Sequence, residues 1–206
     1  MKEHHFMKWL ALGDSYTIGE SVSASERYPV QAVRKLEIKH IHFKDPKIIA
    51  TTGWTTADLL SAIQKQEMSA TYDIVSLLIG VNNQYQQKTE SEYREQFTEL
   101  LQKSIQFSGN RPSHVIVLSI PDYSVTPFAH DRDRASITKQ IDSFNLINKT
   151  LSAVYQVNYL DITEESRKAA GEPSFIAADG LHFSGKEYAI WADRLVTLIE
   201  RAGLLT

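Results

Sequence analysis

Hydrophobic residues along this chain follow two alternating patterns. Five short runs are rich in aliphatic residues, and longer amphipathic stretches lie between them. The runs span residues 6–12, 47–51, 72–79, 114–120 and 157–162. The third run is apolar at almost every position, which is typical of a strand covered on both faces. The five runs therefore predict five β-strands.

The stretches between the runs repeat apolar residues at spacings of three and four, as in helices with one buried face. The pattern is clearest in residues 93–105, 137–155 and 188–198. Strands that alternate with helices imply a parallel sheet with right-handed crossovers and helices on both faces. We therefore expect an α/β fold. No change in composition calls for a second domain, so residues 1–206 are predicted to form one.

Composition and charge narrow the classes of function. The formal net charge of −3 and the pI near 6.2 provide no basic field, so we expect no nucleic-acid partner. The sequence has no cysteine, which excludes disulfides, thiolate nucleophiles and cysteine zinc sites within it. The pairs His4-His5 and His40-Ile41-His42 lack carboxylates at ligand spacing, so no metal site is expected there.

Membrane and targeting signals are weak. No apolar run approaches the ~18 residues that a membrane-spanning helix needs. The first apolar segment has about five residues, fewer than the roughly 7–15 of a signal-peptide core. We expect a cytoplasmic protein without stable membrane insertion.

Small and polar residues follow four of the predicted strands, the last after an intervening short helix. The blocks are Gly13-Asp14-Ser15, Gly53-Trp54, Gly80-Val81-Asn82-Asn83 and Asp179-Gly180-Leu181-His182. In open parallel sheets, ligands bind beyond the carboxyl ends of the strands, and these ends meet at one edge. We therefore expect the four blocks to form one site.

The blocks hold complementary groups for acyl transfer. A serine hydroxyl is a weak nucleophile until a neighbouring base takes its proton, and His182 is the candidate base for Ser15. Asp179 precedes His182 by three residues, so it is a candidate to accept from one ring nitrogen and fix the tautomer. The backbone N–H groups of Ser15 and Gly53 and the side-chain amide of Asn82 are candidate oxyanion donors.

Each block taken alone has a second interpretation. Gly13-Asp14-Ser15 is also compatible with a strand-to-helix turn capped by the serine, and Asp179-Gly180 with a plain turn. The occurrence of all four blocks in order at strand ends favours the catalytic interpretation.

The four blocks together resemble those of the SGNH hydrolases, also called GDSL esterases or lipases, and the resemblance covers residues 8–192. It implies a three-layer α/β/α sandwich with a five-stranded parallel sheet in the flavodoxin-like order 2-1-3-4-5. It also implies Ser15 as nucleophile, His182 as base, Asp179 as its partner, an oxyanion hole of Ser15, Gly53 and Asn82, and neither metal nor cofactor. Asn83 stands where the family commonly has Asp, which puts the stabilisation of that loop in question more than catalysis.

The resemblance predicts hydrolysis of a carboxylic ester through an acyl-enzyme. Because the base must be neutral, kcat/KM should rise through roughly pH 6–7, where an ordinary histidine loses its proton. Small esters, acetylated sugars and lysophospholipids are all substrates within the family, and the sequence selects none. Trp54, Tyr123 and Phe128 are candidates to contact the substrate, because they follow a site block or lie in the irregular segment 121–134, a candidate rim loop. Tyr16 and Tyr85 are further candidates to border the cleft.

Two other functions are compatible with parts of the sequence. Residues 180–187 nearly match the phosphate-binding pattern G-x-x-x-x-G-K-[ST], but Glu187 replaces the hydroxyl and no strong strand leads into the segment. We expect Ser184 to cap the final helix there instead. The remaining alternative is a non-catalytic ester- or glycan-binding protein on the same scaffold.

Overall fold

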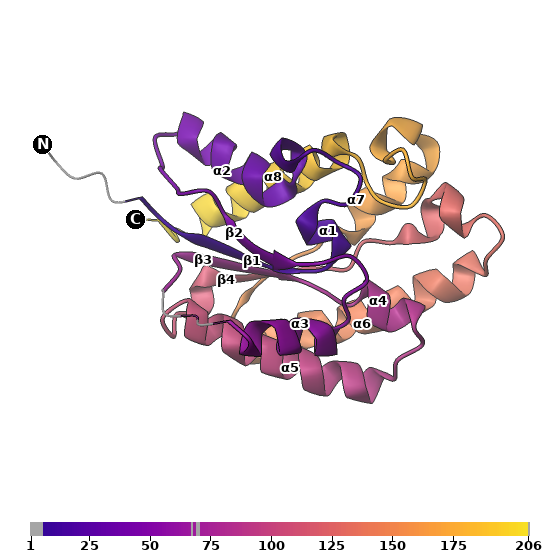
Figure 1. Ribbon diagram of the computed structural model, residues 1–206, viewed down its shortest axis with the longest axis horizontal. Helices are drawn as coiled ribbons and strands as arrows, with labels where there is room; N and C mark the ends of the chain where they lie inside the picture. The colour runs from indigo at the N-terminus through magenta and orange to yellow at the C-terminus, as the bar shows by residue number, and fades with distance from the viewer. Residues whose placement is uncertain (1–5, 67, 69–70, 206) are drawn as a thin grey trace, which may run out of the picture.

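Five parallel strands form the centre of the protein (Figure 1). The computed structural model describes residues 6–66, 68 and 71–205. The strands are β1 (Trp9–Gly13), β2 (Lys47–Ala50), β3 (Ile74–Leu78), β4 (Val115–Leu118) and β5 (Asn158–Leu160). They lie in the order β2-β1-β3-β4-β5, which confirms the predicted strand number and order.

Every strand is shorter than the hydrophobic run that predicted it. The first run begins at Phe6, but β1 begins at Trp9, and Met7 makes only an isolated bridge to Phe43. Ile79 and Ile120 are buried just beyond β3 and β4 without being part of the sheet. Hydrophobicity records burial rather than strand pairing, so the run overestimates the strand at its ends.

Helices cover both faces of the sheet (Figure 1). On one face α2 packs against α8, and on the other α3 and α6 pack against α5. The helices are α1 (Ser15–Ile18), α2 (Tyr28–Ile38), α3 (Thr56–Gln64), α4 (Val81–Tyr85), α5 (Glu90–Phe107), α6 (Arg134–Val154), α7 (Thr163–Lys168) and α8 (Gly185–Arg201). No helix within the described residues is long and apolar enough to cross a membrane.

The sheet is apolar because it is buried between the helices. In register, Leu12 of β1 pairs with Ile49 on one side and Leu77 on the other. Ser76 is the one polar residue of β3, and its hydroxyl accepts a hydrogen bond of 3.0 Å from the Trp9 indole N–H. A buried polar group of this kind is tolerated because its partner is buried with it.

Ser184 stands at the N-terminal cap position of α8 but does not cap the helix. Its hydroxyl donates instead to the carbonyl oxygen of Ser174, at 2.7 Å. The predicted position was therefore right and the predicted hydrogen bond wrong, because the hydroxyl bonds to the 3₁₀ turn η6 (Pro173–Phe175) instead.

Candidate active site

Ser15 is the first residue of α1, and only Asp14 separates it from Gly13, the last residue of β1. The Asp14 carboxylate, not a serine, caps this short helix by accepting from the Tyr16 N–H at 3.1 Å. The turn requires glycine at position 13, because a Cβ there would lie 2.1 Å from Thr17 Oγ1. This close approach brings the Ser15 side chain to the carboxyl edge of the sheet, where it lines a cavity.

Asp179 and His182 form a connected pair in the loop before α8. Asp179 Oδ2 lies 2.6 Å from His182 Nδ1, and Asp179 Oδ1 accepts from the Leu181 and His182 backbone N–H groups, each at 2.9 Å. Partial burial acts to raise the pKa of Asp179, but hydrogen bonds from Ser21 and His182 outweigh it and hold that pKa well below its ordinary value. The carboxylate is therefore ionised and orients the imidazole.

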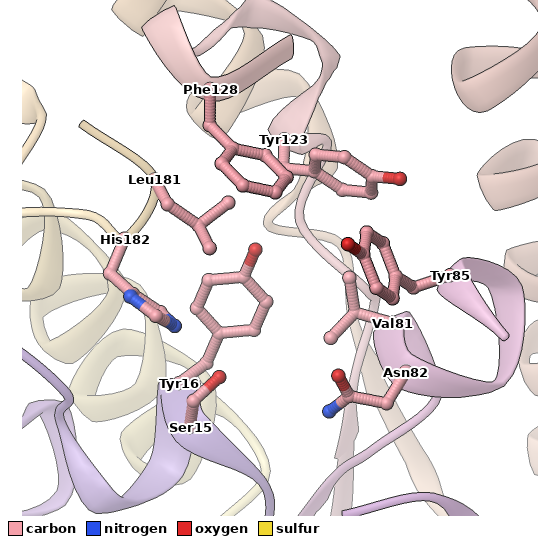
Figure 2. A pocket seen from close by; sticks show the side chains of 9 residues that line it. All are labelled: Ser15, Tyr16, Val81, Asn82, Tyr85, Tyr123, Phe128, Leu181 and His182. Carbon is pink, nitrogen blue, oxygen red and sulfur yellow. The ribbon is translucent and has the colours of Figure 1, made fainter. Parts of the chain in front are cut away.

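Ser15 and His182 line the same cavity, and Figure 2 shows the imidazole turned towards the serine hydroxyl. Among the described residues, no hydrogen bond joins the two side chains. In unliganded enzymes this contact is often long, and it tightens when substrate binds. Both residues are almost fully buried, at 4% and 7% exposure, so water has restricted access to them.

Gly53 and Asn82 lie on neighbouring loops beyond β2 and β3. Gly53 has a φ of 88°, which glycine adopts without strain, and a Cβ added there would contact nothing within 4 Å. The Asn82 amide donates one hydrogen bond to the Trp54 carbonyl oxygen at 3.0 Å. This contact ties the two loops together and leaves the second N–H of the amide for a ligand.

The hydrogen bonds of Asn83 explain why asparagine fits at this position, where the family commonly has aspartate. Its Oδ1 accepts from the Thr56 N–H at 3.0 Å, and its Nδ2 donates to Thr56 Oγ1 at 2.7 Å. The Thr56 hydroxyl donates its only proton to Gln96 Oε1, so its oxygen can only accept from residue 83. An ionised aspartate has no proton to donate. Asparagine therefore stabilises this loop where an aspartate would leave a buried mismatch.

A cavity of about 210 Å³ opens beside Ser15 (Figure 2). Its walls are mostly apolar and come from four separate segments: Ser15, Tyr16, Val81, Asn82, Tyr85, Tyr123, Phe128, Leu181 and His182. The rings of Tyr85, Tyr123 and Phe128 pack in pairs with centroids 6.3–6.5 Å apart. The Arg132 guanidinium lies 4.5 Å from the Phe128 ring centroid and supports this aromatic wall from outside.

Most of the predicted site residues come together here. Ser15, His182, Asn82, Tyr123 and Phe128 line the cavity, and so do Tyr16 and Tyr85. Trp54 and Gly53 are not among the lining residues, and the half-buried Trp54 side chain packs against the hydrophobic core. The segment 121–134 contains two short 3₁₀ turns, η3 (Tyr123–Val125) and η4 (Pro127–Ala129), which carry part of the wall.

Sequence reasoning missed three residues of this region. Val81 and Leu181 line the cavity from inside two of the recognised blocks, where their apolar character was the available signal. Ser21 bonds to Asp179 across 158 positions of sequence, and no local pattern marks it.

No group of three or more His, Asp or Glu side chains that could hold a metal ion occurs in residues 6–66, 68 and 71–205. His4 and His5 lie outside the described residues. His42 lies near the Phe6 ring, with centroids 6.2 Å apart.

Solved structures of similar fold include several hydrolases. A lipase/acylhydrolase from Enterococcus faecalis superposes with a TM-score of 0.73 at 22% identity, covering 98% of each chain. An acetylxylan esterase from Geobacillus stearothermophilus has a TM-score of 0.71 at 19% identity, over 97% of this chain and 96% of that one. A lipase from a goat rumen metagenome has a TM-score of 0.75 at 19% identity, over 93% and 97%.

A comparison with curated proteins gives no significant match. The model of the GDSL-like Lipase/Acylhydrolase family matches residues 11–190, which include all four strand-end blocks. The match spans most of the chain and agrees with the fold and with the residues gathered at the cavity. The chain therefore belongs to the GDSL-like lipase/acylhydrolase family, and it is a hydrolase of the esterase and lipase class.

Proposed function

We propose that this protein hydrolyses carboxylic esters through an acyl-enzyme on Ser15. His182 takes the Ser15 proton as the hydroxyl attacks the ester carbonyl, and returns it to the leaving alcohol. The same imidazole then activates water, which releases the acid. The proposal rests on the 2.6 Å contact between Asp179 Oδ2 and His182 Nδ1, because this contact leaves the other ring nitrogen of His182 to serve Ser15.

The tetrahedral intermediate carries a negative charge that needs hydrogen-bond donors. The Ser15 N–H stands at the start of α1, and the second amide N–H of Asn82 is not used by Trp54. The positive φ of Gly53 supports a third donor, because its backbone lies open to solvent without a side chain. We assign these three groups as the oxyanion hole.

Substitution of the assigned residues tests the mechanism. Ser15→Ala and His182→Ala should abolish ester hydrolysis while circular dichroism shows a folded protein. Asp179→Ala should retain more activity, since the base remains. Asn82→Ala should lower kcat by about 10²–10³, the usual loss for one oxyanion donor. Ser91→Ala, on the exposed face of α5, is the control and should leave kcat unchanged. Wild-type turnover in Ser15→Ala would contradict the mechanism.

The cavity supports a small acyl group as the substrate's acid part. Its volume of about 210 Å³ lies below the roughly 300–1,000 Å³ of pockets for drug-sized ligands. Its wall consists largely of Tyr85, Tyr123, Phe128 and Leu181, which offer apolar contact and few hydrogen bonds. Among small esters, acetylated sugars and lysophospholipids, we therefore favour short-chain esters over substrates with long acyl chains.

A series of p-nitrophenyl esters from acetyl to palmitoyl tests this preference. We expect kcat/KM to be highest for acyl groups of a few carbons and to fall for palmitoyl, because a long chain exceeds the cavity. An acetylated xylose oligosaccharide in the same panel tests whether the alcohol part matters. A maximum at palmitoyl would contradict the assignment of this cavity to the acyl group.

A further inference from the structure

The segment that follows α1 connects the candidate nucleophile to two of the other loops of the site. Gly19 ends α1, and Glu20 and Ser21 follow at once. The Thr52 hydroxyl donates to the Glu20 carboxylate, which ties this segment to the loop of Gly53. Ser21 Oγ donates to Asp179 Oδ2 at 2.6 Å, which ties it to the loop of His182. Two consecutive residues therefore hold two separate site loops.

Ser21 binds the same carboxylate oxygen that contacts the imidazole. Asp179 Oδ2 receives Ser21 Oγ and His182 Nδ1, each at 2.6 Å. The Oδ1 oxygen receives only backbone N–H groups of its own loop, from Leu181 and His182. Among the described residues, Ser21 is thus the one donor to Asp179 from outside that loop. This bond fixes the carboxylate relative to the segment that follows the nucleophile helix.

The backbone of Ser21 adopts a conformation that disfavours serine. Its φ is 63°, in the left-handed region where side chains other than glycine and asparagine are uncommon. Strain of this kind persists where the surroundings require a particular side chain, and it clusters at functional sites. Glycine would fit the backbone better but would lose the hydroxyl that reaches Asp179.

We propose that Ser21 is a positioning residue, which holds Asp179 so that His182 is aligned for proton transfer from Ser15. This inference rests on the proposed acyl-enzyme mechanism and adds a fourth member to its chain of hydrogen bonds. The low pKa of Asp179 agrees with it, because the hydrogen bond from the Ser21 hydroxyl lowers this pKa against the effect of burial, together with the bond from His182.

Other ionisable groups lie near Asp179 and His182, and their titration has to be distinguished from a change at Asp179. Tyr16 lies edge-on to the His182 ring, with centroids 5.7 Å apart. The negative charge of Asp179 contributes to the raised pKa of Tyr188. Burial raises the pKa of both tyrosines well above 10, so neither titrates near neutral pH. Asp14 also acts on both tyrosines, and burial raises its pKa to about 7, so it titrates in the same range in the wild type and in every variant below. The Glu20 carboxylate also faces this region and accepts from Thr52. It is unchanged in the variants below.

Four variants test the proposal in the full-length protein. Ser21→Ala and Ser21→Gly both remove the hydroxyl, and each should lower kcat by about 3- to 10-fold, the loss expected for one hydrogen bond to a charged but partly solvated group. KM for a short ester should stay the same. Ser21→Asn tolerates the left-handed backbone and carries a donor, so it should recover part of the activity. Ser25→Ala removes a nearby hydroxyl that bonds to Ser23, and it should leave kcat unchanged.

The melting temperature and the pH profile of the Ser21 variants distinguish a positioning role of Ser21 from a role in folding. Ser21→Gly relieves the strained φ, so its melting temperature should equal or exceed that of the wild type while its kcat falls. With one donor fewer, Asp179 attracts the proton on the imidazolium more strongly. The acid limb of the kcat/KM profile should therefore move to higher pH in both Ser21→Ala and Ser21→Gly.

A double-mutant cycle tests whether Ser21 acts through Asp179. Adding Ser21→Ala to Asp179→Ala should cause no further loss, because the acceptor is gone. Independent losses that multiply would overturn the proposal, as would wild-type kcat and pH profile in Ser21→Ala and Ser21→Gly. Failure of the acyl-enzyme mechanism itself is a different result, since it appears as turnover in Ser15→Ala.

Discussion

At the scale of single residues, Asp14 is an ionisable group fully buried beside the candidate nucleophile. Burial raises its pKa from 3.8 to about 7, and backbone N–H groups, the Tyr16 N–H among them, only partly oppose this effect. Its Oδ1 caps α1, whereas Oδ2 has no hydrogen-bond partner within the described structure. The carboxyl therefore gains a proton at far higher pH than an exposed aspartate.

This shift predicts a stability that depends on pH. Between about pH 4 and 7 the folded protein keeps the Asp14 proton and the unfolded chain has lost it. The stabilisation by Asp14 is thus complete below about pH 4 and is lost as the pH rises from there through about 7. Over this range the free energy of unfolding should fall by on the order of 4 kcal/mol. Asp14→Asn keeps an oxygen to cap α1 but cannot ionise.

Urea unfolding at pH 4, 6 and 8 measures this effect. The free energy of unfolding of Asp14→Asn, relative to the wild type, should rise steadily across the series. Asp45→Asn, at an exposed carboxylate, is the matched control. A constant difference between Asp14→Asn and the wild type at all three pH values would show that Asp14 is ionised throughout.

At the scale of elements, the turns η3 and η4 carry Tyr123 and Phe128 of the aromatic wall, and a partly buried ion pair anchors η3. Asp122 caps η3 by accepting from the Ser124 N–H at 3.0 Å, and its other oxygen accepts from Thr138 at 2.8 Å. Arg167 of α7 donates to that same oxygen at 3.0 Å. Tyr123 follows Asp122 directly, so these contacts fix the position of its ring in the cavity.

Arg167→Met should loosen this part of the cavity. It leaves the Asp122 carboxylate buried without its ionic partner, which typically costs about 3–5 kcal/mol, and somewhat less here because the Arg167 side chain is a quarter exposed. KM should rise most for the longest acyl group that the wild type accepts, while kcat for acetyl esters changes little. Thermal melting and the ester series measure both effects.

Lys168→Met is the control for Arg167→Met, because it removes only a surface ion pair with Glu165. Such pairs contribute roughly 0–1 kcal/mol, so stability and KM should change little. Equal effects of the two variants would contradict a specific role for the Asp122–Arg167 pair.

The elements themselves follow closely from the sequence, but their ends do not. The predicted run 72–79 contains β3, and the stretch 93–105 lies inside α5. The run 6–12 includes Phe6 and Met7, which precede β1, and misses Gly13 at its end. Periodic burial is a local property that the sequence records. Strand ends depend on which neighbouring backbone is available to pair, and that is decided elsewhere in the chain.

At the scale of the whole molecule, the strand order brings the site together. The parallel order β2-β1-β3-β4-β5 directs the carboxyl ends of β1, β2 and β3 to one edge. Those ends hold Ser15, Gly53 and Asn82, and the loop before α8 adds Asp179 and His182. Because the same edge receives every block, residues separated by more than 160 positions line one cavity.

The sequence by itself determined the fold class, the strand order implied by the resemblance, and the residues proposed for catalysis. These features depend on local periodicity and on short motifs at strand ends. Only the tertiary structure decided that Trp54 packs on the core and that Asn83 satisfies Thr56. It also decided that Ser21 reaches Asp179. Such contacts join segments distant in sequence, and their geometry follows from packing that no local pattern encodes.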